Sequence, residues 1–189
     1  MLLDEKVELL ARALGQADVP HAFGGAIALA YYAVPRGTRD VDINIFLPAS
    51  VFDRVLAALL PLGVEPPDPS MRRTLEREEQ VRLFWDGTPL DLFFSYTKLH
   101  DACVGRQRKV AFGAQRITIL SPEDLAIFKV LFAREKDWRD LHEMLLAQAA
   151  EFDAAYAIGW LERIVAPDDE RLARFRALVA ARSPDDQEP

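Results

Sequence analysis

The sequence predicts an α+β fold, in which a mixed, twisted β-sheet domain with helices is followed by a C-terminal α-helical domain. In residues 1–120, segments with helical spacing of apolar residues are interspersed with short runs in which apolar and polar residues alternate. From Ser121 onward only the helical spacing remains. We therefore expect a sheet domain at residues 1–120, a helical domain at 121–182 and an acidic tail at 183–189.

The beginning of the sheet domain is expected to hold short elements of both kinds. Gly15 ends the first helix, and Pro35 with Gly37 ends the second. Apolar residues then alternate with polar ones from Val41 to Leu47, which is typical of a half-buried strand. The expected elements are a helix over 3–14, a strand over 19–23, a helix over 26–33 and a strand over 40–47.

The rest of this domain is expected to add a helix and two hairpins. Asp86-Gly87 lies between two alternating runs and is typical of a two-residue hairpin turn. A second hairpin is expected to turn near Gly113, and the proline-rich stretch 66–69 is expected to be a linker. The expected elements are a helix over 51–60, strands over 81–85 and 90–96, and a hairpin over 109–120.

The helical domain begins with a strong helix-start signal. Ser121 is a good capping residue, and Pro122 suits the first helical turn. Glu123 and Asp124 follow near the positive end of the helix dipole. Apolar residues recur at helical spacing after this start, and the later segments predict two or three more helices.

The composition limits the class of protein. Half of the 189 residues are hydrophobic, so the chain can bury a substantial core. The single cysteine, Cys103, excludes an intramolecular disulfide and a cysteine-rich zinc site. No apolar run approaches the roughly 20 residues of a membrane span, and the N-terminus lacks a signal-peptide pattern. We therefore expect a cytoplasmic protein with no membrane partner.

The charge of the chain limits its binding to nucleic acids. A net charge of −7 argues against a general nucleic-acid coat, because nonspecific binding depends on cations that neutralise phosphates. A local basic strip is nevertheless present, to which Arg72 and Arg73 are expected to add. Its residues are Arg106, Arg108, Lys109 and Arg116. In an otherwise acidic protein, such a strip is expected to bind one polyanion in one orientation.

Three aspartates are the candidate chemical groups. Asp40 and Asp42 share one face of the predicted strand, where they lie about 6–7 Å apart and would repel each other without a cation. Asp91 is the acidic residue of another predicted strand, on the face opposite its apolar row. If the two strands are neighbours, the three carboxylates form an oxygen-only site that suits Mg²⁺ or Mn²⁺ and the oxygens of a triphosphate. Asp91 is then the candidate general base.

The order of these motifs resembles the nucleotidyltransferase superfamily named after DNA polymerase β, and specifically its minimal and AbiEii-like toxin branch. The motifs of the sheet domain are Gly24-Gly25, Thr38-x-Asp40-x-Asp42 and Leu90-Asp91-Leu92. Those of the helical domain are Ile119-x₄-Asp124-Leu125-x₃-Lys129 and Arg134-x-Lys136-Asp137-x-x-Asp140. The resemblance covers roughly residues 20–145, and it departs from the superfamily at Gly24-Gly25, where Gly-Ser is frequent.

The resemblance implies roles for individual residues. Asp40, Asp42 and Asp91 would be the catalytic, metal-binding carboxylates. A second set would bind the nucleoside triphosphate, and its members are Gly24, Gly25, Thr38, Arg39, Lys129, Lys136 and Asp137. Structural interpretations stay open for several residues, since Thr38 could shape a turn, Lys129 could extend to solvent, and Lys136 could pair with Asp140.

The implied activity is the transfer of a nucleoside monophosphate from a nucleoside triphosphate to an acceptor hydroxyl, with Mg²⁺ or Mn²⁺ as cofactor. The resemblance further implies a toxin that modifies the 3′ end of tRNA and is paired with a cognate antitoxin protein. Two alternatives stay open at this point. One is a nucleotidyltransferase for small molecules of the aminoglycoside type, and the other is an inactive binding or antitoxin module with the same fold.

Overall fold

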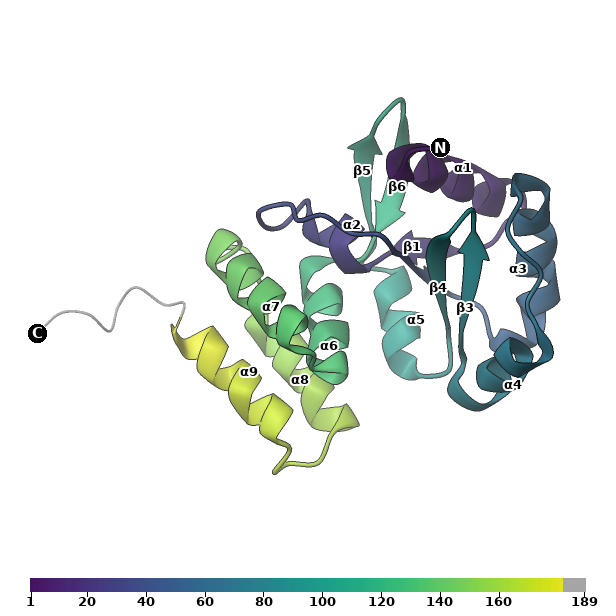
Figure 1. Ribbon diagram of the computed structural model, residues 1–189. Coiled ribbons are helices and arrows are strands. Elements are labelled where there is room, and N and C mark those ends of the chain that lie inside the picture. Colours follow the sequence, from purple (N-terminus) through teal and green to yellow (C-terminus); the bar gives the residue numbers. More distant parts are fainter. Residues whose placement is uncertain (182–189) are drawn as a thin grey trace, which may run out of the picture. The chain divides into compact units, whose positions relative to one another are not determined.

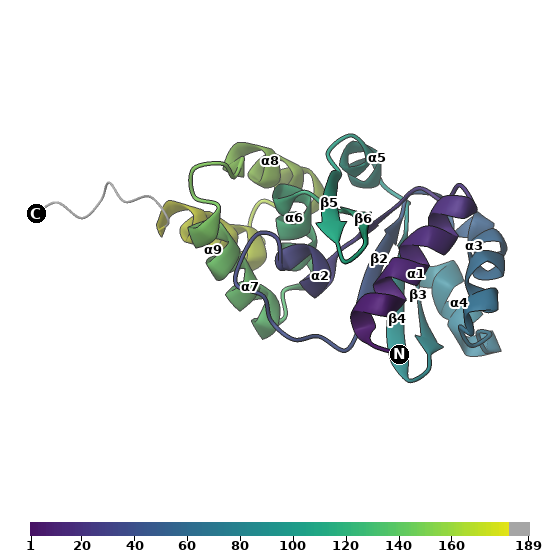
Figure 2. The same cartoon turned by 90° about the horizontal axis from the view of Figure 1, so that it is seen from above.

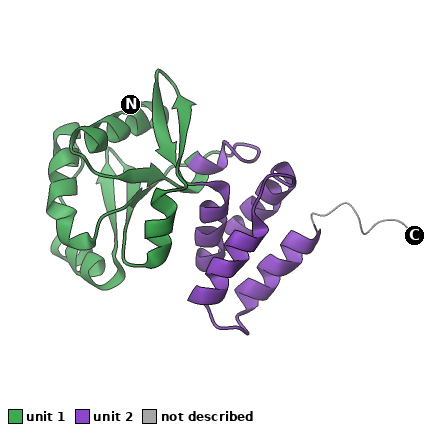
Figure 3. Cartoon of the chain, turned by 180° about the vertical axis from the view of Figure 1, so that it is seen from behind, with its two compact units in different colours: residues 1–27, 37–120 green, residues 28–36, 121–189 purple. Residues whose placement is uncertain are grey.

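The computed structural model describes residues 1–181, which form two compact units (Figure 3). Unit 1 comprises residues 1–27 and 37–120. Unit 2 comprises residues 28–36 and the chain from Ser121 onward, so the helical unit also takes a segment from the N-terminal half. The acidic tail expected at 183–189 lies outside the described residues.

Unit 1 contains a sheet and its covering helices (Figure 1). The short helix α2 (Gly25–Leu29) starts in unit 1 and ends in unit 2. The strands are β1 (His21–Phe23), β2 (Val41–Ile45), β3 (Gln80–Trp85), β4 (Thr88–Phe94), β5 (Arg108–Phe112) and β6 (Gln115–Ile119). The helices are α1 (Leu3–Gln16), α3 (Phe52–Leu59), α4 (Pro69–Glu78) and α5 (Lys98–Val104), with short 3₁₀ turns at η1 (Ala49–Val51) and η2 (Leu60–Leu62).

The sheet is mixed, which confirms the predicted fold class. Its strand order is β3-β4-β2-β1-β6-β5. The pairs β2–β4 and β1–β6 are parallel, whereas β1–β2, β3–β4 and β5–β6 are antiparallel. Both hairpins lie where the sequence predicts them, and they place β3 and β5 at the two edges of the sheet.

One face of the central strands is apolar and covered by helices. Val41, Ile43 and Ile45 of β2 pair in register with Leu90, Leu92 and Phe94 of β4, and all six are buried. The ring of Phe52 in α3 lies against Phe94, and the buried ammonium of Lys6 in α1 lies over the ring of Trp85. Helices α1 and α3 therefore cover this face (Figure 2). The side chains that alternate with the apolar row lie on the opposite face.

Helix α4 is an element that the sequence pattern does not reveal. The expected linker ends at Asp68, whose carboxylate caps α4 by accepting from the backbone N–H groups of Ser70 and Met71 at 2.7 and 3.0 Å. The helix buries only Leu75 and is otherwise rich in charged residues. Because a single buried side chain produces almost no apolar periodicity, the helix leaves little signal in the sequence.

Unit 2 is a set of helices packed around α6 (Pro122–Phe132). As predicted, the Ser121 hydroxyl caps this helix and accepts from the Asp124 backbone N–H at 3.1 Å. Most of α6 is buried, and it packs against the three helices that follow. These are α7 (Glu135–Ala147), α8 (Ala154–Ile164) and α9 (Glu170–Ala181). Among residues 1–181, no helix is both long and apolar enough to cross a membrane.

A buried ion network joins α6 and α7 inside unit 2. The ammonium of Lys129 donates to Asp140 at 2.6 Å and to Asp137 at 3.4 Å. Arg36 holds Asp140 through two bonds of 2.8 and 2.9 Å, and Arg134 holds Asp137 at 2.7 Å. The side chains of Lys129, Asp137 and Asp140 are at most 6% exposed, so their charges are neutralised by one another and not by water.

The pKa of Asp140 reflects this network. Desolvation acts to raise the pKa, but the hydrogen bonds from Arg36 and Lys129 outweigh it and leave the pKa of Asp140 below its ordinary value. A carboxyl whose pKa is lowered by folding stabilises the folded state above its unfolded pKa and loses that contribution as the pH falls through the folded pKa. The free energy of unfolding is therefore expected to fall below about pH 4, measured by chemical unfolding at several pH values.

Replacing Lys129 with Met is expected to lower the free energy of unfolding by about 3 kcal/mol, because two buried carboxylates lose their shared cation. The measurement is chemical unfolding followed by circular dichroism. The matched control is Lys136→Met on α7, where the lysine is only partly buried and the expected change is below about 0.5 kcal/mol. Equal unfolding curves for the two variants would contradict a stabilising role of the network.

Candidate active site

The face of the sheet opposite the apolar row carries charged side chains on neighbouring strands. Asp42 in β2 is the register partner of Asp91 in β4, and Asp91 is the register partner of Arg82 in β3. Neighbouring strands lie about 4.8 Å apart, so the two carboxylates emerge side by side from parallel strands. We call Asp42, Asp91 and Arg82 the charged row.

Asp40 lies next to this row, one residue before β2 begins. The hydroxyl of Thr38 donates to its carboxylate and thereby orders the turn that leads into the strand. Arg39, between these two residues, is exposed. The structure thus places Asp42 and Asp91 side by side near the start of the β2–β4 pairing, with Asp40 one residue ahead of β2 and bonded to Thr38.

The two glycines after β1 lie against Asp42, Gly24 at its backbone and Gly25 at its carboxylate. The Gly24 N–H donates to the Asp42 backbone carbonyl at 2.9 Å. Gly25 has a φ of +50°, and a Cβ atom at this position would lie 1.7 Å from Oδ2 of Asp42. Only glycine therefore leaves room for the carboxylate in this orientation. Helix α2 has only five residues, so we assign no role to its N-terminus. The feature of this motif that the structure supports is the close approach of the glycine backbone to Asp42.

Arg82 is a residue of the site that the sequence analysis does not single out. Its Nε and Nη2 donate to the two carboxylate oxygens of Asp91, each at 2.7 Å. The hydrogen bond to Asp91 raises the pKa of Arg82, and the charges of Asp91, Asp40 and Asp42 raise it further. A signal was available, because a two-residue turn at Asp86-Gly87 places Arg82 opposite Asp91 by counting back along the hairpin.

The donor set suits a hard divalent cation. Carboxylate oxygens are the ligands that Mg²⁺ and Mn²⁺ prefer, and Asp42 and Asp91 present theirs from adjacent positions. Within residues 1–181, however, no three His, Cys, Asp or Glu side chains converge closely enough to hold a metal ion as they stand. Arg82 meanwhile donates to both carboxylate oxygens of Asp91.

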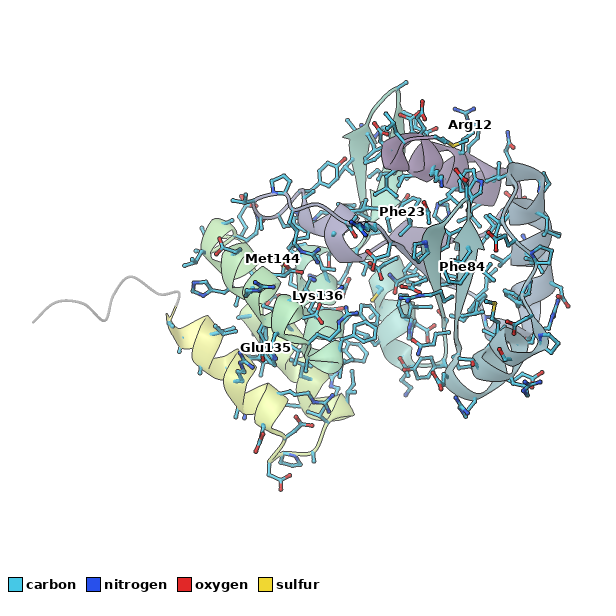
Figure 4. The ribbon with its side chains drawn as sticks, viewed as in Figure 1. Arg12, Phe23, Phe84, Glu135, Lys136 and Met144 are labelled. Atoms are coloured by element: carbon cyan, nitrogen blue, oxygen red, sulfur yellow. The ribbon has the colours of Figure 1, made fainter. Side chains whose placement is uncertain are left out.

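The predicted nucleotide-binding residues of the helical domain have different surroundings. Lys129 and Asp137 belong to the buried ion network of unit 2, so each is already paired with an opposite charge. Lys136 is partly exposed on α7 (Figure 4). Of the three side chains, only that of Lys136 lies outside the buried ion network.

The predicted basic strip is divided by the register of the β5–β6 hairpin. Lys109 pairs with Thr118 and Ala111 with Arg116, which places Lys109 and Arg116 on one face. Arg108 precedes Lys109 in the same strand and therefore points to the opposite face. Lys109 and Arg116 are both exposed.

A cavity of about 530 Å³ lies elsewhere in unit 1. Its charged lining residues are Asp53, Glu76, Glu79 and Arg72, and Arg72 pairs with Asp53 at 2.8 Å. The lining also includes Ser95, which follows β4 and lies four residues beyond Asp91, or about 13 Å along the strand. This cavity is therefore distinct from the charged row.

Comparison with solved structures shows which proteins share this fold. ANT(2'')-Ia in complex with adenylyl-2''-tobramycin gives a TM-score of 0.52 at 14% identity, over 95% of this chain and 97% of the other. The lincosamide antibiotic adenylyltransferase LnuA with bound lincomycin gives 0.53 at 13% identity, over 76% of this chain and 96% of the other. At such identities the likeness shows the fold alone.

The sequence comparison shows the family. No curated protein matches the chain in sequence. Residues 2–183 match the family described as nucleotidyltransferase of unknown function, DUF6036. This match confirms the nucleotidyltransferase superfamily and the enzyme class that the motifs predict. With nearly its whole length matched, the chain belongs to this nucleotidyltransferase family.

Proposed function

We propose that the charged row is the catalytic centre and that the enzyme transfers a nucleoside monophosphate from a nucleoside triphosphate to an acceptor hydroxyl. The observation that carries this proposal is the register of β2 and β4, which pairs Asp42 with Asp91 on the face of the sheet opposite the apolar row. Asp40 adds a third carboxylate two residues before Asp42. An inactive module would have no need for three carboxylates at one end of a strand pair.

Each residue has a distinct task in this mechanism. Asp40 and Asp42 would hold Mg²⁺ or Mn²⁺, which supplies charge neutralisation for the triphosphate and lowers the pKa of a bound hydroxyl. Asp91 completes the site and accepts the proton of the acceptor hydroxyl. The acceptor oxygen then forms a bond to the α-phosphorus, the bond from that phosphorus to the β-phosphate bridge breaks, and pyrophosphate leaves. Gly25 keeps the space that the Asp42 carboxylate occupies.

We further propose that the acceptor is RNA, most specifically the 3′ end of tRNA, in a toxin that is neutralised by an antitoxin. The resemblance of the motifs to AbiEii-like toxins supports this assignment, and so do the two exposed cations on one face of β5–β6. With Asp53 paired to Arg72, the cavity has Glu76 and Glu79 as its remaining charges, which favours a cationic small molecule as ligand. Its distance of about 13 Å along β4 from Asp91 argues against a direct role of that cavity in acceptor binding.

Replacing Asp42 or Asp91 with Asn is expected to lower nucleotidyl transfer at least about 100-fold, because several kcal/mol of transition-state stabilisation depend on these carboxylates. The measurement is incorporation of label from an α-labelled triphosphate in the presence of Mg²⁺. Asp53→Asn removes an exposed carboxylate in the same unit and is expected to retain activity. Transfer at the wild-type rate by Asp42→Asn would refute the proposed centre.

Gly25→Ala is expected to abolish transfer while the protein stays folded. The added Cβ would occupy the position of Oδ2 of Asp42 and force the carboxylate to rotate away. Gly37→Ala is the matched control, because nothing lies within 4 Å of a Cβ at that position. Both variants are compared by circular dichroism and by the transfer assay. An active Gly25→Ala enzyme would show that the observed orientation of Asp42 is not needed.

The RNA acceptor predicts an effect of the β5–β6 hairpin. The double variant Lys109→Glu, Arg116→Glu is expected to reduce labelling of tRNA at least about tenfold and to make it less dependent on salt, because two phosphate contacts are lost. Arg108→Glu makes a charge reversal on the opposite face and is expected to have a smaller effect. Purified tRNA, an aminoglycoside and a lincosamide are offered in parallel. Label on an antibiotic alone would refute the RNA acceptor.

A further inference from the structure

The charged row contains its own cation. Arg82 forms two parallel hydrogen bonds with Asp91, each of 2.7 Å, and leaves neither carboxylate oxygen without a partner. Asp42 is the neighbour of Asp91 on the other side of β4. A carboxylate that is doubly bonded to a guanidinium is a poor ligand for a metal ion until the guanidinium leaves. The geometry therefore sets Arg82 and a divalent cation in competition for Asp91.

Arg82 is placed so that it can be displaced. It lies on β3, at an edge of the sheet, and its side chain is 55% exposed, whereas that of Asp91 is 15% exposed. The guanidinium can therefore move into solvent without disturbing the apolar face, which is formed by the alternate residues of β3. A surface ion pair of this kind adds little to stability by itself. Its position beside two further carboxylates gives it a larger electrostatic role.

The hairpin fixes Arg82 at this position. The turn at Asp86-Gly87 pairs Trp85 with Thr88 and hence Arg82 with Asp91. The backbone of that turn is held from inside the unit, because the buried ammonium of Lys6 donates to the carbonyls of Trp85 and Asp86 at 2.7 and 3.3 Å. A one-residue slip of β3 would move Arg82 to the apolar face, so the register is strongly specified.

We propose that Arg82 is an internal counter-ion of the carboxylates, which occupies Asp91 in the resting enzyme and is displaced when a divalent cation binds. This inference rests on the proposed function, since it assigns the carboxylates to a metal site. It adds a residue that sets the affinity of that site for the cation. The resting enzyme then binds the metal weakly, because the cation must compete with a charge already in place.

The test measures cation binding without nucleotide or turnover. Free Mn²⁺ is quantified by electron paramagnetic resonance during titration of the wild-type protein and of Arg82→Gln. Removal of one positive charge beside two carboxylates is expected to tighten Mn²⁺ binding at least about tenfold. Arg82→Lys keeps the charge but loses the two-point bond, and its affinity is expected to lie between the two. Thermal unfolding of each variant verifies that the hairpin is intact.

Two further variants locate the effect. Arg72→Gln removes an exposed arginine that is also paired with an aspartate at 2.8 Å, so its Mn²⁺ affinity is expected to equal that of the wild type. Asp42→Asn is expected to abolish the tightening when combined with Arg82→Gln. Should Arg82→Gln fail to fold, the comparison of Arg82→Lys with the wild type decides the question in the same way.

The possible outcomes separate the inference from the proposed function. Equal Mn²⁺ affinity in wild type, Arg82→Gln and Arg82→Lys, with loss of binding in Asp42→Asn, would overturn the counter-ion and leave the metal site standing. Absence of Mn²⁺ binding in every variant up to millimolar concentration would overturn the metal site and, with it, the counter-ion. Tighter binding in Arg82→Gln that depends on Asp42 supports both.

Discussion

The pairing register of three neighbouring strands is the constraint on which the candidate site depends. Because β2 and β4 run parallel with Asp42 opposite Asp91, a single face collects the carboxylates, and the same register buries the apolar residues on the other face. A shift by one residue would exchange the two faces. The hydrophobic core under α1 and α3 therefore positions the chemistry, since burial of Ile43 and Leu92 holds Asp42 and Asp91 side by side.

The two units differ in how their aspartates are paired with cations. In unit 2, Lys129 and two arginines neutralise Asp137 and Asp140 where water is excluded, which makes these charges part of the fold. In unit 1, Arg82 neutralises Asp91 where the guanidinium remains accessible, so the same type of pair can be opened by a ligand. The difference lies in Lys129, whose side chain is 5% exposed, because a buried cation cannot leave its carboxylates for solvent as Arg82 can.

The turn before β2 follows directly on a segment that belongs to unit 2. Arg36 is held by Asp140 through two hydrogen bonds, and the chain returns to unit 1 at the next residue. Thr38 and Asp40 follow immediately and are bonded to each other. Within unit 1, the bond from Thr38 to Asp40 orders the segment that carries the first carboxylate before the strand begins.

Much of the fold and of the candidate site was accessible from the sequence. Alternation of apolar and polar residues identified the strands, and the Ser121 cap identified the start of α6, because these features depend only on neighbours along the chain. Helix α4 was not predicted, since its single buried residue leaves no periodicity of apolar residues in the sequence.

Contacts between distant segments were decided only by the tertiary structure. The pairing of β2 with β4, the enclosure of Lys129 by Asp137 and Asp140, and the assignment of residues 28–36 to the helical unit all join parts of the chain that no local pattern relates. Arg82 is partly predictable from the sequence, because the hairpin turn determines that its partner is Asp91. Only the pairing of β4 with the parallel strand β2 makes Asp91 part of a site with Asp42.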